Sequence, residues 1–361
     1  MTEIVESNLQ LEKLDTNKER FEFLKKRIIE RVQNTAKQAH DEFEKELETR
    51  IQDLDIDPEK QPQAYKKRRR KLRKEIDFYK TIKLNIISGL DDLRRELEQS
   101  TRFKDYIPEL NALIDAARTM YLSQLKVKHK EYQVMTGAPQ LSDEEIREQE
   151  RLTEDMTESR SLVQWYVMQN ESDHDYLTEL FNAFRDTMNQ LGFENDWRGM
   201  ERGLRQELGV LKLLNKYFKK VTPGNPKEDA HFAIDFWAET NNGNTIIFQS
   251  KSSFAGLDDD IYGEEKISDL EKELSASPIP PIKYQRDSSG YELPASDLVK
   301  VRKLQQDIKK AKEHAQGRGA DKPHFYLIVS SADNYKEITG EPDSQATKSI
   351  ENSLRQISIL Y

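Results

Sequence analysis

The amino-acid sequence predicts a two-part protein, an all-α N-terminal half of long helices followed by a C-terminal α/β domain with a mixed sheet. In residues 1–194, apolar residues recur at helical spacing between long stretches of Glu, Lys and Arg, and glycine is rare. Near Gly192 the pattern changes to the alternation typical of strands. This change places the domain boundary there and the second domain at residues 195–361.

Composition limits the classes of protein to consider. Charged residues make up 34% of the chain and hydrophobic residues 35%, a balance typical of long solvated helices. There is no apolar run of ~18 residues and no leader-like pattern, so we expect a cytoplasmic protein without membrane contact. The net charge of −9 argues against a protein that coats nucleic acid through bulk positive potential.

The chain has no cysteine, and its six scattered histidines offer no zinc spacing. Any metal must therefore sit on oxygen ligands. Such ligands favour Mg²⁺ or Mn²⁺.

Two helices of the first half are predicted to form an antiparallel hairpin, on either side of the turn-forming stretch around Pro58. The apolar positions of the first are Phe21, Leu24, Ile28, Val32, Ala36, Phe43, Leu47 and Ile51. Those of the second, spaced as in a coiled coil, are Leu72, Ile76, Tyr79, Lys83, Ile86, Leu90, Leu93 and Leu97. This seam also suggests a homodimer.

Local signals predict further helix boundaries. A third helix follows Pro108 and ends before Gly137, with its apolar side at Leu110, Leu113, Ala117, Tyr121 and Leu125. Ser142 and Glu145 form a capping-box pattern for a fourth helix. Asn195 or Asp196 is expected to cap the helix that opens the second domain, whose apolar positions are Leu204, Leu208, Leu211, Leu214 and Phe218.

The second domain continues with a predicted hairpin, HFAIDFWAET and NTIIFQSKSS, joined by Asn241, Asn242 and Gly243. Residues 254–295 resemble a long insertion. Beyond it we expect a helix from about Ser296 and a buried strand at Phe325–Ser330. The apolar side of a last helix is Ala346, Ile350, Leu354 and Ile357.

The hairpin register brings three polar side chains together. A three-residue loop with glycine in the left-handed position closes the turn. In that register Asp235 lies opposite Gln249, with Lys251 one diagonal step away on the same face. The other face carries apolar residues suited to packing against helices, namely Ile234, Phe236, Ala238, Ile246 and Phe248.

These residue types suit phosphodiester hydrolysis. Asp235 would anchor a divalent cation, with the amide oxygen of Gln249 and the backbone carbonyl of Ser250 as further ligands. The cation lowers the pKa of a bound water and neutralises charge on the phosphate. Lys251 would then face the nucleophile and the phosphate.

The order of elements and the motif at Gln249–Lys251 resemble the PD-(D/E)XK nuclease superfamily, and the QSK triplet is most similar to its Mrr-like restriction endonuclease branch. The resemblance covers roughly residues 196–361. It implies a metal-dependent DNA endonuclease in a restriction or anti-phage defence setting, with Glu207 as a further ligand or water-organising group. Two departures are Ile234 in place of the name-giving proline and Gln249 in place of the usual acid, which removes a negative charge from the metal site.

Basic residues outside the hairpin predict contact with nucleic acid. Eight of the nine residues from 66 to 74 are basic, namely Lys66, Lys67, Arg68, Arg69, Arg70, Lys71, Arg73 and Lys74. Such a run attracts phosphate backbones, and the alternative is a helix end neutralised by surrounding acids. Lys309 and Lys310, on the helix after the insertion, are further candidates for phosphate contact.

Two other interpretations stay open. The substrate can be RNA rather than DNA. The chain can also be a catalytically inactive nuclease-fold protein that acts as a nucleic-acid-binding or coiled-coil scaffold.

Overall fold

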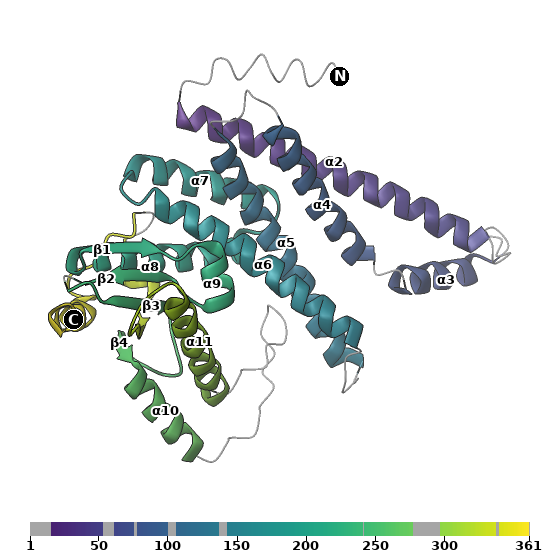
Figure 1. The fold of residues 1–361 in the computed structure, drawn as a ribbon. Helices are drawn as coiled ribbons and strands as arrows, with labels where there is room; N and C mark the ends of the chain where they lie inside the picture. The colour runs from purple at the N-terminus through teal and green to yellow at the C-terminus, as the bar shows by residue number, and fades with distance from the viewer. Residues whose placement is uncertain are drawn as a thin grey trace.

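The computed structural model describes residues 16–52, 61–75, 78–99, 106–136, 143–240, 242–276, 297–336 and 339–360. Helices come first and a mixed sheet with its own helices follows, which confirms the predicted fold class (Figure 1). The leading helices are α2 (Asn17–Gln52), α3 (Pro62–Glu75), α4 (Phe78–Glu98), α5 (Ile107–Thr136), α6 (Asp143–Gln169), α7 (His174–Gln190) and α8 (Glu194–Tyr217). None of the helices in the described ranges combines the length and apolarity that a membrane crossing needs.

Helices α2 and α4 form the antiparallel pair predicted from their apolar spacing. The Phe43 ring of α2 packs at a tilt of 48° against Phe78 at the start of α4, with ring centroids 4.3 Å apart. Arg31, nearer the start of α2, pairs with Glu96 near the end of α4. A Cβ on Gly89 would lie only 2.6 Å from the Thr35 hydroxyl, so the close approach of the two helices requires glycine there.

The predicted seam is not one continuous helix. The chain divides into α3 and α4, and Tyr79 is 60% exposed, so its assignment to the seam is wrong. Leu90, Leu93 and Leu97 are buried within a single chain, against α2 and α5. These leucines are therefore not exposed, and they do not form the homodimer surface that their spacing suggested.

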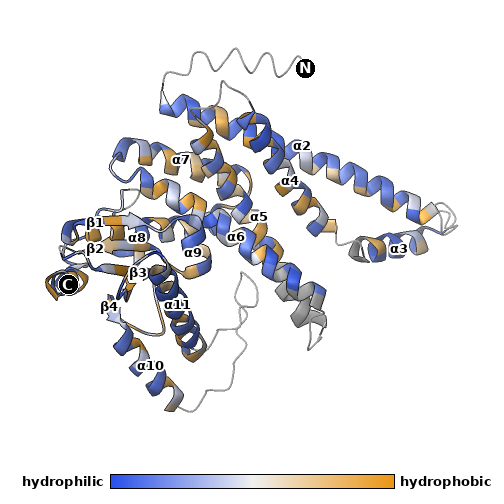
Figure 2. Ribbon diagram, in the orientation of Figure 1, coloured by the Kyte–Doolittle hydropathy of each residue, from blue (hydrophilic) through white to orange (hydrophobic). Residues whose placement is uncertain are grey.

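One hydrophobic cluster joins the helices to the sheet. It runs from Leu90 and Leu113 through Phe184 and Trp197 to Phe248 of the sheet. Figure 2 shows the corresponding striped pattern on most helices, whereas α3 is almost wholly hydrophilic. The helical half and the sheet therefore share one core.

Helix α8 begins at Glu194, with Phe193 in the N-cap position and no side-chain cap. The predicted cap at Asn195 or Asp196 is therefore wrong. Phe193 is buried, and its ring packs edge-on against Tyr121 of α5 with centroids 4.8 Å apart. Burial of this ring determines where α8 starts.

The sheet has the strand order β1-β2-β3-β5-β4, formed by β1 (Lys220–Pro223), β2 (Phe236–Glu239), β3 (Thr245–Lys251), β4 (Asp260–Gly263) and β5 (His324–Val329). β3 and β5 are parallel and the other neighbours are antiparallel. Phe236 pairs with Phe248, which confirms the predicted hairpin register. Gly243 has φ +80°, as the turn requires.

The two faces of the sheet are covered by different helices. Phe236 and Phe248 belong to the cluster shared with α8 and α12 (Lys348–Leu360). On the other face, Ile247 and Leu327 pack with α10 (Glu264–Ala276) and α11 (Asp297–Gly317). Gln249 and Lys251 share this second face by strand alternation. Asp235 precedes β2, and its N–H donates to the Phe248 carbonyl at 3.1 Å while its Oδ2 accepts from the Ser250 N–H, so it meets β3 next to Gln249 and not directly opposite it as predicted.

Several local predictions need correction. Part of the expected insertion is integral to the domain, because β4 pairs with β5 and α10 packs on α11. Ile234 packs with Ile247 rather than with Phe236, since it still belongs to the turn after α9 (Pro226–Phe232), where its N–H donates to the Glu228 carbonyl at 3.3 Å. Ala346 is exposed and precedes α12.

The short elements β1 and α9 were not predicted, since four and seven residues are too few for a periodic signal. Some predictions fall outside the described residues. These concern Pro58, Ile76, Gly137, Ser142, Asn241 and Ser296, together with residues 277–295.

A shared core predicts coupled unfolding. Phe184 is fully buried, with its ring centroid 5.0 Å from that of Trp197. We expect Phe184→Ala to cost about 3–5 kcal/mol, and to lower the urea midpoints of helical circular dichroism and tryptophan fluorescence together. Ile359→Ala, at a 75% exposed position, is the control and should change stability by less than about 0.5 kcal/mol. A shift in only one of the two signals would show that the parts unfold separately.

Candidate active site

The candidate site lies at the carboxyl ends of the parallel strands β3 and β5. Asp235 directly precedes β2, with its N–H donating to the Phe248 carbonyl at 3.1 Å, while Lys251 ends β3. Asp235 and Gln249 are both buried, and Lys251 is half-buried. The structure thus brings the three side chains of the predicted constellation to one edge of the sheet.

Backbone groups hold Asp235 in place. Its Oδ2 accepts a hydrogen bond from the Ser250 N–H at 2.6 Å, and its own carbonyl accepts from the Gly224 N–H at 2.8 Å. A side chain on Gly224 would collide with the Ile234 carbonyl, at 2.0 Å, so only glycine allows this approach. Because the N–H and C=O of one strand residue point to the same edge, the Ser250 carbonyl also faces the Asp235 side.

Helix α8 contributes two neighbouring side chains. Gln206 donates a hydrogen bond to the Ser250 hydroxyl. Glu207 is buried, and one of its carboxylate oxygens lies 3.7 Å from the Arg160 guanidinium. The charges of Asp235 and Lys251 act on Glu207, so the structure places this predicted residue with the others.

Three residues of the site were not anticipated. Asp229 of α9 lies close enough to Asp235 to raise its pKa, and it accepts a hydrogen bond from the Ser161 hydroxyl of α6. Arg160, beside Ser161, faces Glu207. The sequence gives a weak indication of Asp229, because it is an acid six residues before Asp235. It gives none for Arg160 and Ser161, because their place in the site depends on how α6 packs on α9.

The pKa values of two acids in the site are strongly raised. Burial raises the pKa of Glu207 to about 8; the Arg160 charge opposes this rise and the Asp235 charge adds to it. Burial also raises the pKa of Asp235 to about 7, with Lys251 lowering it and Asp229 raising it. The neighbouring positive charges are too few to offset the repulsion between these acids when all of them are ionised. A divalent cation would supply the missing positive charge, so this electrostatic environment favours its binding.

The donor set fits a hard divalent cation. Gln249 Oε1 and Glu207 Oε2 are buried oxygens that receive no hydrogen bond within the described part of the chain. With the carboxylate of Asp235 and the carbonyl of Ser250, they are the oxygen types that Mg²⁺ and Mn²⁺ prefer. Among the described residues, no three His, Asp or Glu side chains are grouped to hold a metal by themselves, so the amide and backbone oxygens are needed to complete the set.

The other predicted nucleic-acid contacts lie in different places. The basic run lies on α3, far from the sheet (Figure 1), with Lys66, Lys67 and Arg70 exposed. Arg69 pairs with Glu44 of α2, so acids neutralise part of the run. The side chains of Arg73 and Lys74 lie outside the described part of the structure.

Helix α11 borders the site from the other side. Burial raises the pKa of Asp307, and the charges of Lys303, Lys310 and Lys251 lower it. Asp307 is therefore close to Lys251, while Lys310 is exposed one turn further along α11. Lys309 is exposed and pairs with Glu313 at 3.9 Å.

Comparisons with protein-family models, with curated proteins and with solved structures found no match. The likeness to PD-(D/E)XK nucleases therefore depends on the residues and geometry described above.

The raised pKa of Glu207 predicts a stability change with pH. An acid whose pKa is higher in the folded state stabilises the fold below its ordinary pKa, and this contribution is lost as pH rises through the folded value of about 8. We therefore expect Glu207→Gln in EDTA to raise Tm by roughly 2–4 °C at pH 8.5 and by little at pH 5. Thermal melts at both values test this. An equal or negative change at pH 8.5 would contradict the assignment of an ionised, buried Glu207.

Proposed function

We propose that this chain is a divalent-metal-dependent endodeoxyribonuclease of the PD-(D/E)XK type that hydrolyses phosphodiester bonds. One observation carries the proposal: Asp235, Gln249, Glu207 and Lys251 converge at the carboxyl end of the sheet, with two buried oxygens left without hydrogen-bond donors in the described residues. The restriction or anti-phage setting is proposed from the family resemblance alone.

Each side chain has a distinct task. The Ser250 N–H orients the Asp235 carboxylate, and Gln206 holds the Ser250 hydroxyl. The Lys251 ammonium, close enough to Asp235 to lower its pKa, is positioned to stabilise charge that develops on a phosphate. Glu207, a buried carboxylate beside Asp235, would be a further ligand or would organise the attacking water. A bound Mg²⁺ or Mn²⁺, held by Asp235, Gln249, Ser250 and Glu207, would supply Lewis-acid activation of that water and of the phosphate.

The role of Lys251 predicts a large loss of activity on truncation. Lys251→Ala should reduce Mg²⁺- or Mn²⁺-dependent nicking of supercoiled plasmid by at least ~100-fold, because one preorganised charge at a transition state has an effect of this size. Lys322→Ala is the matched control, since Lys322 is an exposed lysine next to the opposite end of β5. EDTA should abolish nicking by the wild type. Digestion of RNA alongside DNA decides which of the two polymers is the substrate.

If wild type and Lys251→Ala both bind DNA and neither cuts it, the enzyme proposal fails. The chain is then better described as an inactive nuclease fold that serves as a nucleic-acid-binding scaffold. The neutral amide at Gln249 and the exposed basic residues of α3 are the features that favour this second function.

Gln249 offers a direct test of the metal site. Gln249→Glu adds a carboxylate where the buried amide oxygen has no donor within the described residues, so we expect Mn²⁺ affinity to rise by at least roughly tenfold. The midpoint of metal-induced stabilisation in thermal melts measures this. Gln316→Glu, on the C-terminal turn of α11, is the control. Equal midpoints for Gln249→Glu and wild type would exclude Gln249 as a ligand.

A further inference from the structure

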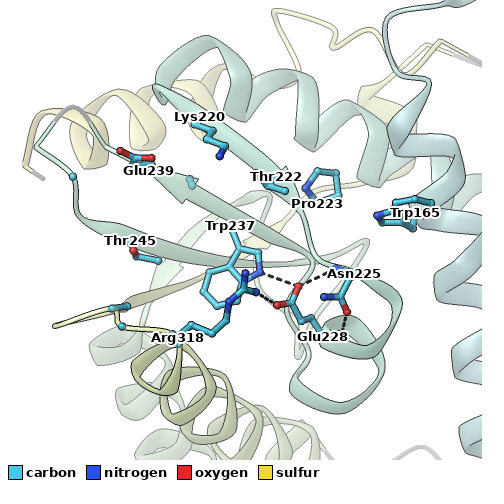
Figure 3. A pocket seen from close by; sticks show the side chains of 15 residues that line it. Trp165, Lys220, Thr222, Pro223, Asn225, Glu228, Trp237, Glu239, Thr245 and Arg318 are labelled. Carbon is cyan, nitrogen blue, oxygen red and sulfur yellow. Dashed lines mark hydrogen bonds and ion pairs between the residues drawn. The ribbon is translucent and has the colours of Figure 1, made fainter.

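A second cavity opens beside the candidate site, between α6 and the β1 edge of the sheet. Its volume is about 510 Å³, within the usual range of small-ligand pockets. Figure 3 shows Arg318 and Trp237 in the middle of this cavity, with Lys220 along β1 and Trp165 reaching in from the neighbouring helix. The predicted catalytic residues do not line it.

The cavity and the site share their walls. Pro223 and Asn225 line the cavity and flank Gly224, whose N–H holds the Asp235 carbonyl at 2.8 Å. Trp237 lies two residues after Asp235, a separation of roughly 7 Å along a strand. A strand of nucleic acid that binds in one can therefore reach the other within about one nucleotide.

Helix α6 lines both places. Its Ser161 donates a hydrogen bond to Asp229 in the site, and Trp165 lies one helical turn further on. Trp165 is 38% exposed, whereas Trp197 is completely buried. The helical half thus places a large, accessible aromatic ring next to the acids.

The opposite wall is a preformed cationic platform. The Arg318 guanidinium lies over the Trp237 ring, 5.2 Å from its centroid. Glu228 accepts hydrogen bonds from both Arg318 and the Trp237 indole N–H, the latter at 3.2 Å. Because Glu228 holds both groups, the guanidinium plane is oriented before any ligand arrives.

We propose that this cavity holds one unpaired base of the nucleic-acid strand whose phosphate enters the Asp235 site. The inference rests on the proposed function. Bases stack on tryptophan rings and on guanidinium planes without regard to sequence. The ammonium of Lys220, exposed at the rim, matches the adjoining phosphate. Since a paired base cannot enter a cavity of this kind without leaving its stack, the substrate class is single-stranded, frayed or locally opened nucleic acid.

Tryptophan fluorescence reports directly on ligand binding in the cavity. Two of the three tryptophans line it, and fully buried Trp197 gives a constant background. Titration with dodecathymidylate in EDTA should quench emission, and a 12-base-pair hairpin duplex should quench it much less. Trp165→Ala should weaken dodecathymidylate binding roughly tenfold, whereas Trp165→Phe, which keeps a stacking ring, should bind nearly as the wild type does. Tyr79→Ala, which removes an exposed ring on α4, is the matched control.

Quenching that is equal for the single strand and the duplex, or binding that is unchanged in Trp165→Ala, would overturn the proposal. The readout needs neither metal nor cleavage, so it separates the two hypotheses. Roughly tenfold weaker binding of dodecathymidylate by Trp165→Ala, followed by the emission of Trp237, supports the base site even if plasmid is never nicked. Nicking that continues while Trp165→Ala binds dodecathymidylate like the wild type removes the base site and leaves the nuclease proposal intact.

Discussion

The site depends on the burial of acids that the protein itself neutralises only in part. Asp235 is held by the Ser250 N–H, but Glu207 and Asp229 bring further negative charge beside it. Lys251 and Arg160 offset some of this charge. The remaining imbalance destabilises the ionised form of the site and favours the approach of a cation. The ionised acids therefore lower the stability of the fold as long as no cation is bound.

The helical half takes part in the site rather than standing apart from it. Helix α6 packs on α9, so that Arg160 and Ser161 meet Glu207 and Asp229. A common hydrophobic cluster from α4 and α5 to the sheet keeps this contact in place. Movement of α6 relative to the sheet would therefore change the electrostatics of the acids and the width of the cavity together.

Two binding features lie close together along the chain at β2. The acids suit a phosphate and a cation, while Trp165, Arg318 and Trp237 suit the flat surface of a base. Their separation of a few residues along β2 is set by the strand repeat. The basic residues of α3 lie far away (Figure 1), so in the proposed nuclease they would contact a distant stretch of the nucleic acid rather than the scissile bond.

The sequence by itself determined the local features: the α2–α4 pairing, the turn at Gly243, and the register of β2 on β3. Apolar spacing and glycine conformations depend on only a few neighbouring residues, so they can be predicted without knowledge of the tertiary structure. Only the tertiary structure decided that β4 belongs to the sheet, and that Ser161 and Trp165 of α6 meet Asp229 and the cavity. These depend on the packing of segments distant in the chain, for which no local pattern exists.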